Sequence, residues 1–285
     1  MRVASLHIHP LKGGAIRDVE RIGAAPIGLD GDRRWMIVDA NGRFLTQREM
    51  PQLARLHAEP TTDGVRLSYD GRTHAATLSG DRADVVVWRS TVNAATVRPE
   101  DDAALSDWLG RPVRLVHHDA RSKRATNEEW SDGEVAFPDG YPILVVLSAS
   151  LDALNERLIE RGDQPVPMSR FRPNVVIDGA TPWEDDGWAT IRVGAMTLDL
   201  VKPCARCTVT TVDQERGAFS GDEPLRTLRA LRMSADRRVP GVLFGWNAVA
   251  RNEGTLRVGD GVEVLERRSP WAIRGRETAT AGLPF

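Results

Sequence analysis

The segment KPCARCTVTTVDQERG, residues 202–217, contains both cysteines of the 285-residue chain, three positions apart and followed directly by a β-branched run. A redox-active Cys-x-x-Cys pair of the thioredoxin type begins a helix after a strand. The run TVTTV favours an extended chain instead, because β-branched side chains lose rotamer freedom in a helix. The segment therefore predicts a strand-rich surrounding and argues against a redox helix.

The two sulfur atoms suit zinc, copper, iron–sulfur clusters or heavier transition metals, and Lys202 and Arg206 are nearby cations that favour a thiolate. A structural zinc site needs four ligands, and the six histidines show no spacing typical of a complete zinc motif. An iron–sulfur cluster generally needs four thiolates. The remaining metal hypothesis is one thiolate on a metal whose other ligands come from a cofactor.

The chain before this segment predicts a small β-rich domain over residues 1–118. Asn41-Gly42 and Asp70-Gly71 each separate two strand-like runs, which is typical of β-hairpins. An apolar strand is expected at 83–90. A short helix is expected at 100–110, with Gly110 as its C-cap.

Residues 117–142 are polar and rich in turn residues, so we place the domain boundary there and expect a second domain over 119–285. A buried strand at 142–148 precedes an amphipathic helix at 150–162. Ser150 is its expected N-cap, and its expected apolar face consists of Leu151, Leu154, Leu158 and Ile159.

The rest of the second half again favours strands. The fold class predicted for the whole chain is α+β and β-rich, with an N-terminal β-barrel-like domain, a second β-barrel domain and a few peripheral helices. Further strands are expected at 174–179, 189–201 and 254–266, and a helix near 223–233.

Composition narrows the function classes. The formal net charge of −2 argues against a nucleic-acid-binding surface, so an anion site would have to be built from local basic residues. The N-terminus does not resemble a signal peptide, and the longest apolar run, at 141–151, is too short to span a membrane. We expect a cytoplasmic protein that does not bind a membrane.

The segment RFRPNVVIDG, residues 170–179, is one candidate anion site. Pro173 disfavours a helical conformation for Arg172, so the sequence predicts an extended chain with Arg170 and Arg172 on one face. Such a pair can bind phosphate, and Asn174 would follow on the same face to reach polar ring atoms. The alternative is two solvated surface arginines beside a core strand.

Two further segments are weak candidates when taken singly. HPLKGGAI, residues 9–16, places Lys12 before two glycines whose backbone amides can approach an anion closely. GLDGDRRWMIVD, residues 28–39, places Arg33 at the start of a strand after a glycine-rich turn. Neither contains a complete phosphate-binding motif.

Together and in this order, the four segments resemble the MOSC-domain family. More narrowly, they resemble the branch that contains the mitochondrial amidoxime-reducing component and bacterial relatives that reduce N-hydroxylated bases. HPLKGG, GLDGDRRW and FLTQRE resemble the family's N-terminal β-barrel. FPDGYPILVVLSASLDALN, RFRPNVVIDG, KPCARCTVTTVDQERG and FGWNAVARNEGTLRVGDGVEV resemble its MOSC core.

The resemblance implies an oxidoreductase that contains the molybdenum cofactor, Mo-molybdopterin. It would reduce N-hydroxylated small molecules with electrons from a separate ferredoxin-like or cytochrome b5-like protein, because no four-cysteine ferredoxin extension is present. The resemblance makes Cys207 the catalytic, metal-binding thiolate. Gly13 stands where close relatives often carry serine, so its backbone alone would contact the phosphate. The other cofactor contacts implied are Lys12, Arg33, Arg172 and Asn174.

Two other functions stay open. The chain could be a non-catalytic carrier of sulfur or molybdopterin that uses Cys207, or a structural β-barrel protein that binds partners through the Trp-rich segment 181–188. Cys204 is expected to act as a small buried hydrophobic residue. Thr210 and Asp213 are candidates for ordering the loop or relaying protons.

Overall fold

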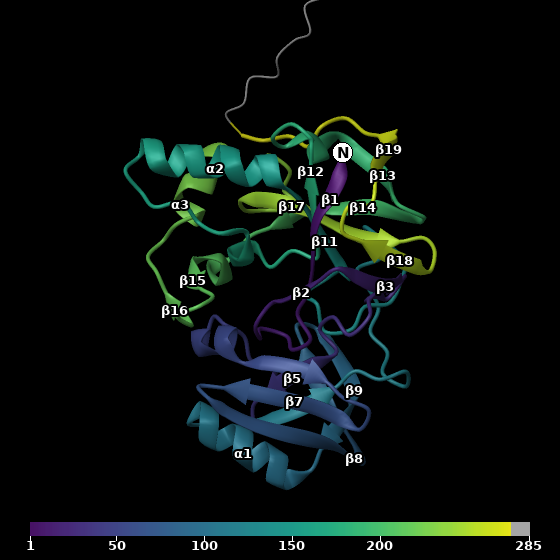
Figure 1. Ribbon diagram of the computed structural model, residues 1–285, viewed down its shortest axis with the longest axis vertical. Coiled ribbons are helices and arrows are strands. Elements are labelled where there is room, and N and C mark those ends of the chain that lie inside the picture. The colour runs from purple at the N-terminus through teal and green to yellow at the C-terminus, as the bar shows by residue number, and fades with distance from the viewer. Residues whose placement is uncertain (275–285) are drawn as a thin grey trace, which may run out of the picture.

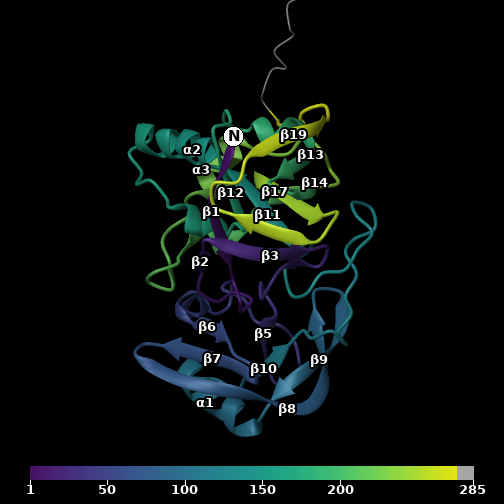
Figure 2. The same cartoon turned by 45° about the vertical axis from the view of Figure 1, so that its right-hand side comes forward.

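The structure is a computed structural model that describes residues 1–274. Figures 1 and 2 show two β-rich units arranged along the long axis, with the three α-helices on their outside. The predicted α+β, β-rich class is confirmed. Among the described residues, no helix is both long and apolar enough to cross a bilayer.

The larger unit is built on an eight-stranded sheet in the order β19-β13-β14-β17-β11-β12-β1-β2. Its neighbouring strands pair antiparallel except β11 and β12, which pair parallel. The strands are β1 (Arg2–Ile8), β2 (Arg17–Val19), β11 (Ile143–Leu147), β12 (Val175–Asp178), β13 (Trp188–Val193), β14 (Met196–Ala205), β17 (Leu243–Ala250) and β19 (Val262–Arg267).

A three-stranded sheet, in the order β18-β3-β4, adjoins this unit. It brings together β3 (Arg21–Ala25), β4 (Gly28–Leu29) and β18 (Gly254–Arg257). Helices α2 (Ser148–Glu160) and α3 (Leu225–Leu231) lie beside the larger sheet (Figure 1). Short 3₁₀ helices occur at η2 (Met168–Phe171), η3 (Glu184–Gly187) and η4 (Thr208–Thr211), and η4 leads into the hairpin of β15 (Val212–Asp213) and β16 (Ala218–Phe219).

The smaller unit is a six-stranded sheet in the order β5-β10-β9-β8-β7-β6, with α1 (Pro99–Leu109) packed against it. Apolar side chains of the strands, of α1 and of the 3₁₀ helix η1 (Pro51–Arg55) form its core. The strands are β5 (Trp35–Val38), β6 (His57–Pro60), β7 (Gly64–Tyr69), β8 (Arg72–Val87), β9 (Ser90–Val97) and β10 (Arg114–His117).

The first 29 residues of the chain contribute strands to the larger unit, because β1 pairs with β12 and β3 pairs with β18. The chain then continues into β5 of the smaller sheet. The segment that follows β1 therefore lies at the junction between the two units. The domain boundary at 118/119 stays a prediction.

Local turn chemistry explains the elements that the sequence predicted well. The Asp70-Gly71 turn joins β7 to β8 with positive φ at both residues, 49° and 76°. Helix α1 ends at Gly110 in the left-handed conformation, as expected. The Asn41-Gly42 turn forms too, but beyond it the expected second strand is reduced to two isolated bridges, Val38 to Phe44 and Arg43 to Val86.

Two expectations for the helix at 150–162 are wrong. The helix begins at Ser148 with Leu147 as its N-cap, and Ser150 lies inside it, where its Oγ accepts a hydrogen bond from the backbone N–H of Trp183 at 2.9 Å. Ile159 is 60% exposed and does not join the apolar face. Leu154 and Leu158 are fully buried in the cluster under the helix, and Leu151 packs against the same cluster.

Candidate functional site

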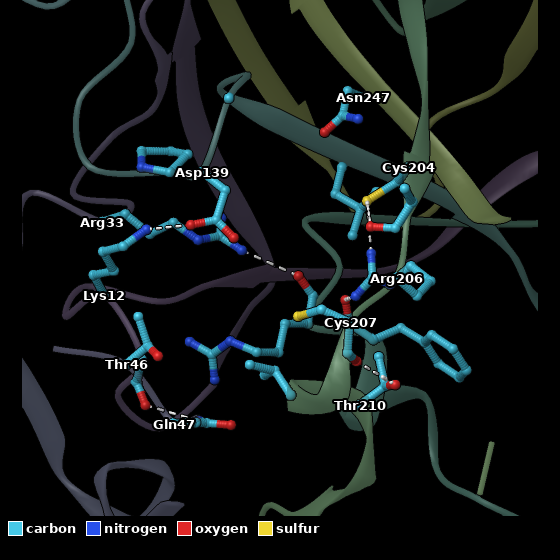
Figure 3. A pocket seen from close by; sticks show the side chains of 18 of the residues that line it. Lys12, Arg33, Thr46, Gln47, Asp139, Cys204, Arg206, Cys207, Thr210 and Asn247 are labelled. Carbon is cyan, nitrogen blue, oxygen red and sulfur yellow. Dashed lines mark hydrogen bonds and ion pairs between the residues drawn. The ribbon is translucent and has the colours of Figure 1, made fainter. Parts of the chain in front are cut away.

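A cavity lies at the junction of the two units and is lined by all six residues predicted for the site, of which Figure 3 labels Lys12, Arg33 and Cys207. Lys12, Thr46 and Gln47 lie on one side in this view, and Cys204, Arg206 and Cys207 lie on the other. The smaller unit, the β1–β2 connection and the η4 loop each supply part of the wall. The six predicted residues in the lining are Lys12, Gly13, Arg33, Arg172, Asn174 and Cys207.

Cys207 is half-buried and precedes η4. Its carbonyl accepts hydrogen bonds from the backbone N–H and the Oγ1 of Thr210, at 3.1 and 2.9 Å. Asp213 orders the next turn, because its Oδ1 accepts the N–H groups of Glu215 and Arg216, each at 3.0 Å. These contacts agree with the expectation that Thr210 and Asp213 order the loop.

The expectation of an extended chain after Cys207 is wrong for Thr208–Thr211, which form a single 3₁₀ turn. Threonine hydroxyls explain the difference, because they hydrogen-bond backbone carbonyls three residues earlier: Thr210 contacts Cys207 and Thr211 contacts Thr208. The extended chain resumes only at β15. As expected, a redox-type α-helix is not formed here.

Cys204 is half-buried and packs against the apolar core beside the site, which agrees in part with the expectation of a small buried hydrophobic residue. It lines the same cavity as Cys207, and its Sγ accepts a hydrogen bond from Arg206 Nη1 at 2.8 Å. Arg206 Nη2 also donates to the carbonyl of Phe171 at 2.7 Å. On the opposite side of the cavity, Arg48 Nη1 lies 4.0 Å from Cys207 Sγ. Each cysteine therefore has its own neighbouring guanidinium.

Lys12 enters the cavity from the β1–β2 connection and is almost fully buried. Its Nζ donates to the carbonyl of Phe137 at 2.8 Å and to Asp139 Oδ1 at 2.5 Å. Burial lowers the pKa of Lys12, although Asp139 opposes the shift. Asp139 is exposed to solvent, and Lys12 holds its pKa well below its usual range. Asp139 is therefore ionised near neutral pH.

The structure corrects the prediction for the RFRP segment. Arg170 belongs to η2, and Arg172 has φ 52° and ψ 51°, which is left-handed and not extended. The two side chains consequently diverge. Arg170 Nη2 donates to Ser220 Oγ at 2.8 Å, whereas Arg172 Nη1 donates to the carbonyl of Gly14 at 2.7 Å beside the cavity.

Arg33 also has positive φ, 47°, and lies next to Arg172. Its Nη1 donates to Asp32 Oδ2 at 2.6 Å and to Asn174 Oδ1 at 3.2 Å, and its Nη2 donates to the carbonyl of Arg172 at 3.2 Å. Asn174 is fully buried, and its amide also contacts the backbone of His7 and Leu144. In this arrangement Asn174 fixes Arg33 and joins β1 to β11.

The charge balance of the cavity favours an anionic ligand. Burial, with a further contribution from Arg33, lowers the pKa of Arg172 to about 9. Arg172 Nη2 is buried and has no hydrogen-bond partner among the described residues. A buried, unpaired guanidinium N–H is costly unless a ligand accepts its hydrogen bond.

The residues that sequence reasoning did not assign to the lining include Gln47, Arg48 and Asp139, and it named Arg206 only as a nearby cation and not as the donor to Cys204. The segments FLTQRE and FPDG contain three of them and were used only for the resemblance. Their polar side chains follow runs with strand or turn character, which is a weak signal. That these residues lie on the same cavity as Cys207 can be seen only in the folded structure, where the two units pack against each other.

The fold and the site define a class: two-unit β proteins with a partly exposed cysteine in a cationic cavity at the junction of the units. The comparisons with known proteins give the family. The model for the MOSC N-terminal beta barrel domain matches residues 1–112, and the model for the MOSC domain matches residues 132–263. The chain belongs to the MOSC-domain family, in the branch of the mitochondrial amidoxime-reducing components.

The relatives match almost the whole chain. Mitochondrial amidoxime-reducing component 1 of Danio rerio is 32% identical over 91% of this chain and 83% of its own length. The protein of the same name from Homo sapiens is 30% identical over 92% of this chain and 82% of its own length. Mitochondrial amidoxime reducing component 2 of Bos taurus is 29% identical, over 91% of this chain and 82% of its own length.

Proposed function

We propose that the protein is a molybdenum-cofactor-dependent oxidoreductase that reduces N-hydroxylated compounds. The observation that carries the proposal is the convergence of the Cys207 thiol and five buried or half-buried cations on one cavity. The names of the relatives support the reaction class, because they describe amidoxime reduction by those proteins.

The residues present fit the cofactor. A soft thiolate is a suitable ligand for molybdenum, and the unpaired Nη2 of Arg172 is a donor suited to a phosphate oxygen. Cys207 Sγ would bind the metal, Lys12, Arg33 and Arg172 would bind the phosphate, and the backbone of Gly13 would lie beside it. Asn174 would act mainly by holding Arg33 in place.

The reaction converts an N–OH group into N–H and water and consumes two electrons and two protons. When bound, the molybdenum cofactor supplies the two-electron chemistry that removes the oxygen. Asp139 stays ionised beside Lys12, so it orients the lysine and accepts hydrogen bonds but does not donate a proton. The protons consumed then come from solvent, which reaches Asp139 at the exposed side of the cavity.

The electrons would come from a separate ferredoxin-like or cytochrome b5-like protein, and we propose a cytoplasmic location for the reaction. The assignment of Cys207 to the metal also restricts the role of Cys204. Cys204 is paired with Arg206 and would not bind the metal, which makes it the natural comparison for Cys207.

The test compares three proteins purified from a host that synthesises molybdopterin: wild type, Cys207→Ala and Cys204→Ala. Molybdenum is measured by elemental mass spectrometry, pterin by fluorescence after oxidation, and activity by oxidation of a reduced dye with an N-hydroxylated substrate. We expect wild type and Cys204→Ala to be active and Cys207→Ala to lose activity. Normal reduction by Cys207→Ala refutes the assignment, and cofactor without any reduction by wild type favours the carrier function.

A further inference from the structure

Trp88 occupies a position that favours glycine. It is the first residue of the two-residue turn between β8 and β9, with φ 56°, and its side chain is 45% exposed. A positive φ is strained for a bulky residue, and an exposed indole gains little from burial. Neither local conformation nor burial accounts for a tryptophan at this position.

The contacts of Trp88 lead into the cavity. Trp88 Nε1 donates a hydrogen bond to Asp139 Oδ1 at 3.2 Å, and the Arg48 guanidinium lies 4.7 Å from the centre of the indole ring. Both Asp139 and Arg48 line the cavity, and Arg48 Nη1 is 4.0 Å from Cys207 Sγ. Trp88 is therefore the outer end of a continuous chain of contacts that begins at the thiol.

The indole is also held in one orientation. The Phe44 ring packs against it with centroids 5.1 Å apart and the planes tilted by 54°. Together with the hydrogen bond to Asp139 and the guanidinium of Arg48, this contact fixes a partly exposed aromatic surface beside two residues of the cavity lining. A fixed aromatic surface can bind a flat substituent by stacking without losing side-chain entropy on binding.

We propose that Trp88 determines specificity by stacking on an aryl substituent of the N-hydroxylated substrate, so that arylamidoximes are preferred to small alkylamidoximes. The inference rests on the proposed function and goes further by naming the substituent that Trp88 would favour. Asp139 would accept a hydrogen bond from the substrate's N–H groups, while the ring of the substrate lies against the indole. An alkyl substrate lacks the stacking surface and gains only the contacts to Asp139.

Two variants separate the aromatic surface from its hydrogen bond. Trp88→Phe keeps a ring but removes the contact to Asp139, and Trp88→Gly removes the ring while suiting the positive φ. Aromatic stacking contributes about 0.5–1.5 kcal/mol, which corresponds to a factor of about 2 to 12 in kcat/KM. For benzamidoxime we expect Trp88→Gly to lower kcat/KM by about that factor and Trp88→Phe to lower it less.

The readout is the ratio of kcat/KM for benzamidoxime to that for acetamidoxime, measured with holoenzyme. Trp108→Ala is the matched control, because Trp108 also carries an arginine, Arg72, on its ring at 5.2 Å but is not part of the cavity lining and belongs to α1, at the end of the smaller unit away from the larger one (Figure 1). We expect this control to leave the ratio unchanged.

The possible results distinguish failure of the proposed function from failure of the role of Trp88. If wild type reduces neither compound, the proposed function fails and the inference fails with it. If wild type reduces both and Trp88→Gly leaves the ratio unchanged, the inference alone is overturned. If Trp88→Gly lowers the melting temperature and reduces both rates equally, Trp88 has a structural role and the inference is again overturned.

Discussion

Gln47 and Gln214 exchange two side-chain hydrogen bonds, at 3.0 and 2.9 Å, across the junction between the two β units. Gln47 follows β5 of the smaller unit, and Gln214 lies in the turn between β15 and β16, in the segment that follows Cys207. Gln47 Nε2 also donates to the carbonyl of Gly13 at 2.8 Å, and Gln214 Oε1 accepts from Arg172 Nη1 at 3.2 Å. The amide pair thus ties two walls of the cavity together.

Breaking this pair should weaken retention of the cofactor more than it weakens the fold. We expect Gln47→Ala and Gln214→Ala each to cost about 1 kcal/mol of cofactor affinity, the net value of a typical hydrogen bond. The double variant should lose less than the sum, because each substitution removes the same pair. Molybdenum and pterin content after dialysis measures the effect. Gln164→Ala, at an exposed loop position, is the control; equal retention by all variants contradicts the role.

Substitutions of Arg172 and of Arg170 should have different effects: the first on anion binding and the second on stability. Inorganic pyrophosphate should raise the melting temperature of the cofactor-free protein, because a ligand that binds only the folded state stabilises it, by about 2.7 kcal/mol at 100 times Kd. Arg172→Gln should abolish that response. Arg170→Gln should lower the melting temperature through loss of the bond to Ser220 and keep the response. A normal pyrophosphate response in Arg172→Gln would remove Arg172 from the anion site.

Local patterns explain which parts of the fold could be predicted from sequence. The hairpin at Asp70-Gly71 and the left-handed end of α1 at Gly110 depend on a few adjacent residues. The position of Ser150 could not be predicted in the same way, because Trp183, 33 residues away, supplies its hydrogen-bond partner. The sequence contains both residues but not their contact.

In the candidate site, too, residue types could be predicted from the sequence, whereas contacts between distant segments could not. Residue chemistry and the resemblance identified Lys12, Arg33 and Cys207, which the fold brings to one cavity. The conformation of Arg172 could not be read from its neighbours: Pro173 disfavours the right-handed helix, and the structure adopts the left-handed region instead of the extended one. Asp139 reaches the cavity only because the polar segment before β11 returns to Lys12.

Gly245 lies in β17 next to β11, with φ 75°. A Cβ at this position would lie 2.5 Å from Val146 Cγ1 and 2.7 Å from the Val145 carbonyl oxygen. Gly245→Ala therefore combines overpacking with backbone strain, and we expect a loss of about 3 kcal/mol in the free energy of unfolding. Gly71→Ala, where φ is 76° and the space is open, should cost only about 1–2 kcal/mol. Urea denaturation measures both, and equal losses would contradict the packing argument.

Asp185 should make the stability of the protein depend on pH. It is buried in η3, and burial together with the neighbouring Asp186 raises its pKa to about 7. Asp186 differs, because Arg232 binds both of its carboxylate oxygens at 2.7 and 2.8 Å. The negative charge of Asp186 is therefore balanced by a direct contact with Arg232, whereas Asp185 has no such contact among the described residues.

The folded-state pKa of Asp185 exceeds its unfolded value, so the folded protein binds more protons between about pH 4 and pH 7 and loses stability as the pH rises through that range. Asp185→Asn keeps the shape and removes this loss. The variant should match wild type near pH 4 and exceed it at pH 8 by at least about 1.4 kcal/mol, the equivalent of one pKa unit. Melting temperatures from pH 4 to 8 measure the difference.

Asp186→Asn should destabilise the protein throughout the range, because Arg232 would lose its buried partner. A difference between Asp185→Asn and wild type that does not change with pH would show that Asp185 is already ionised at low pH in the folded protein.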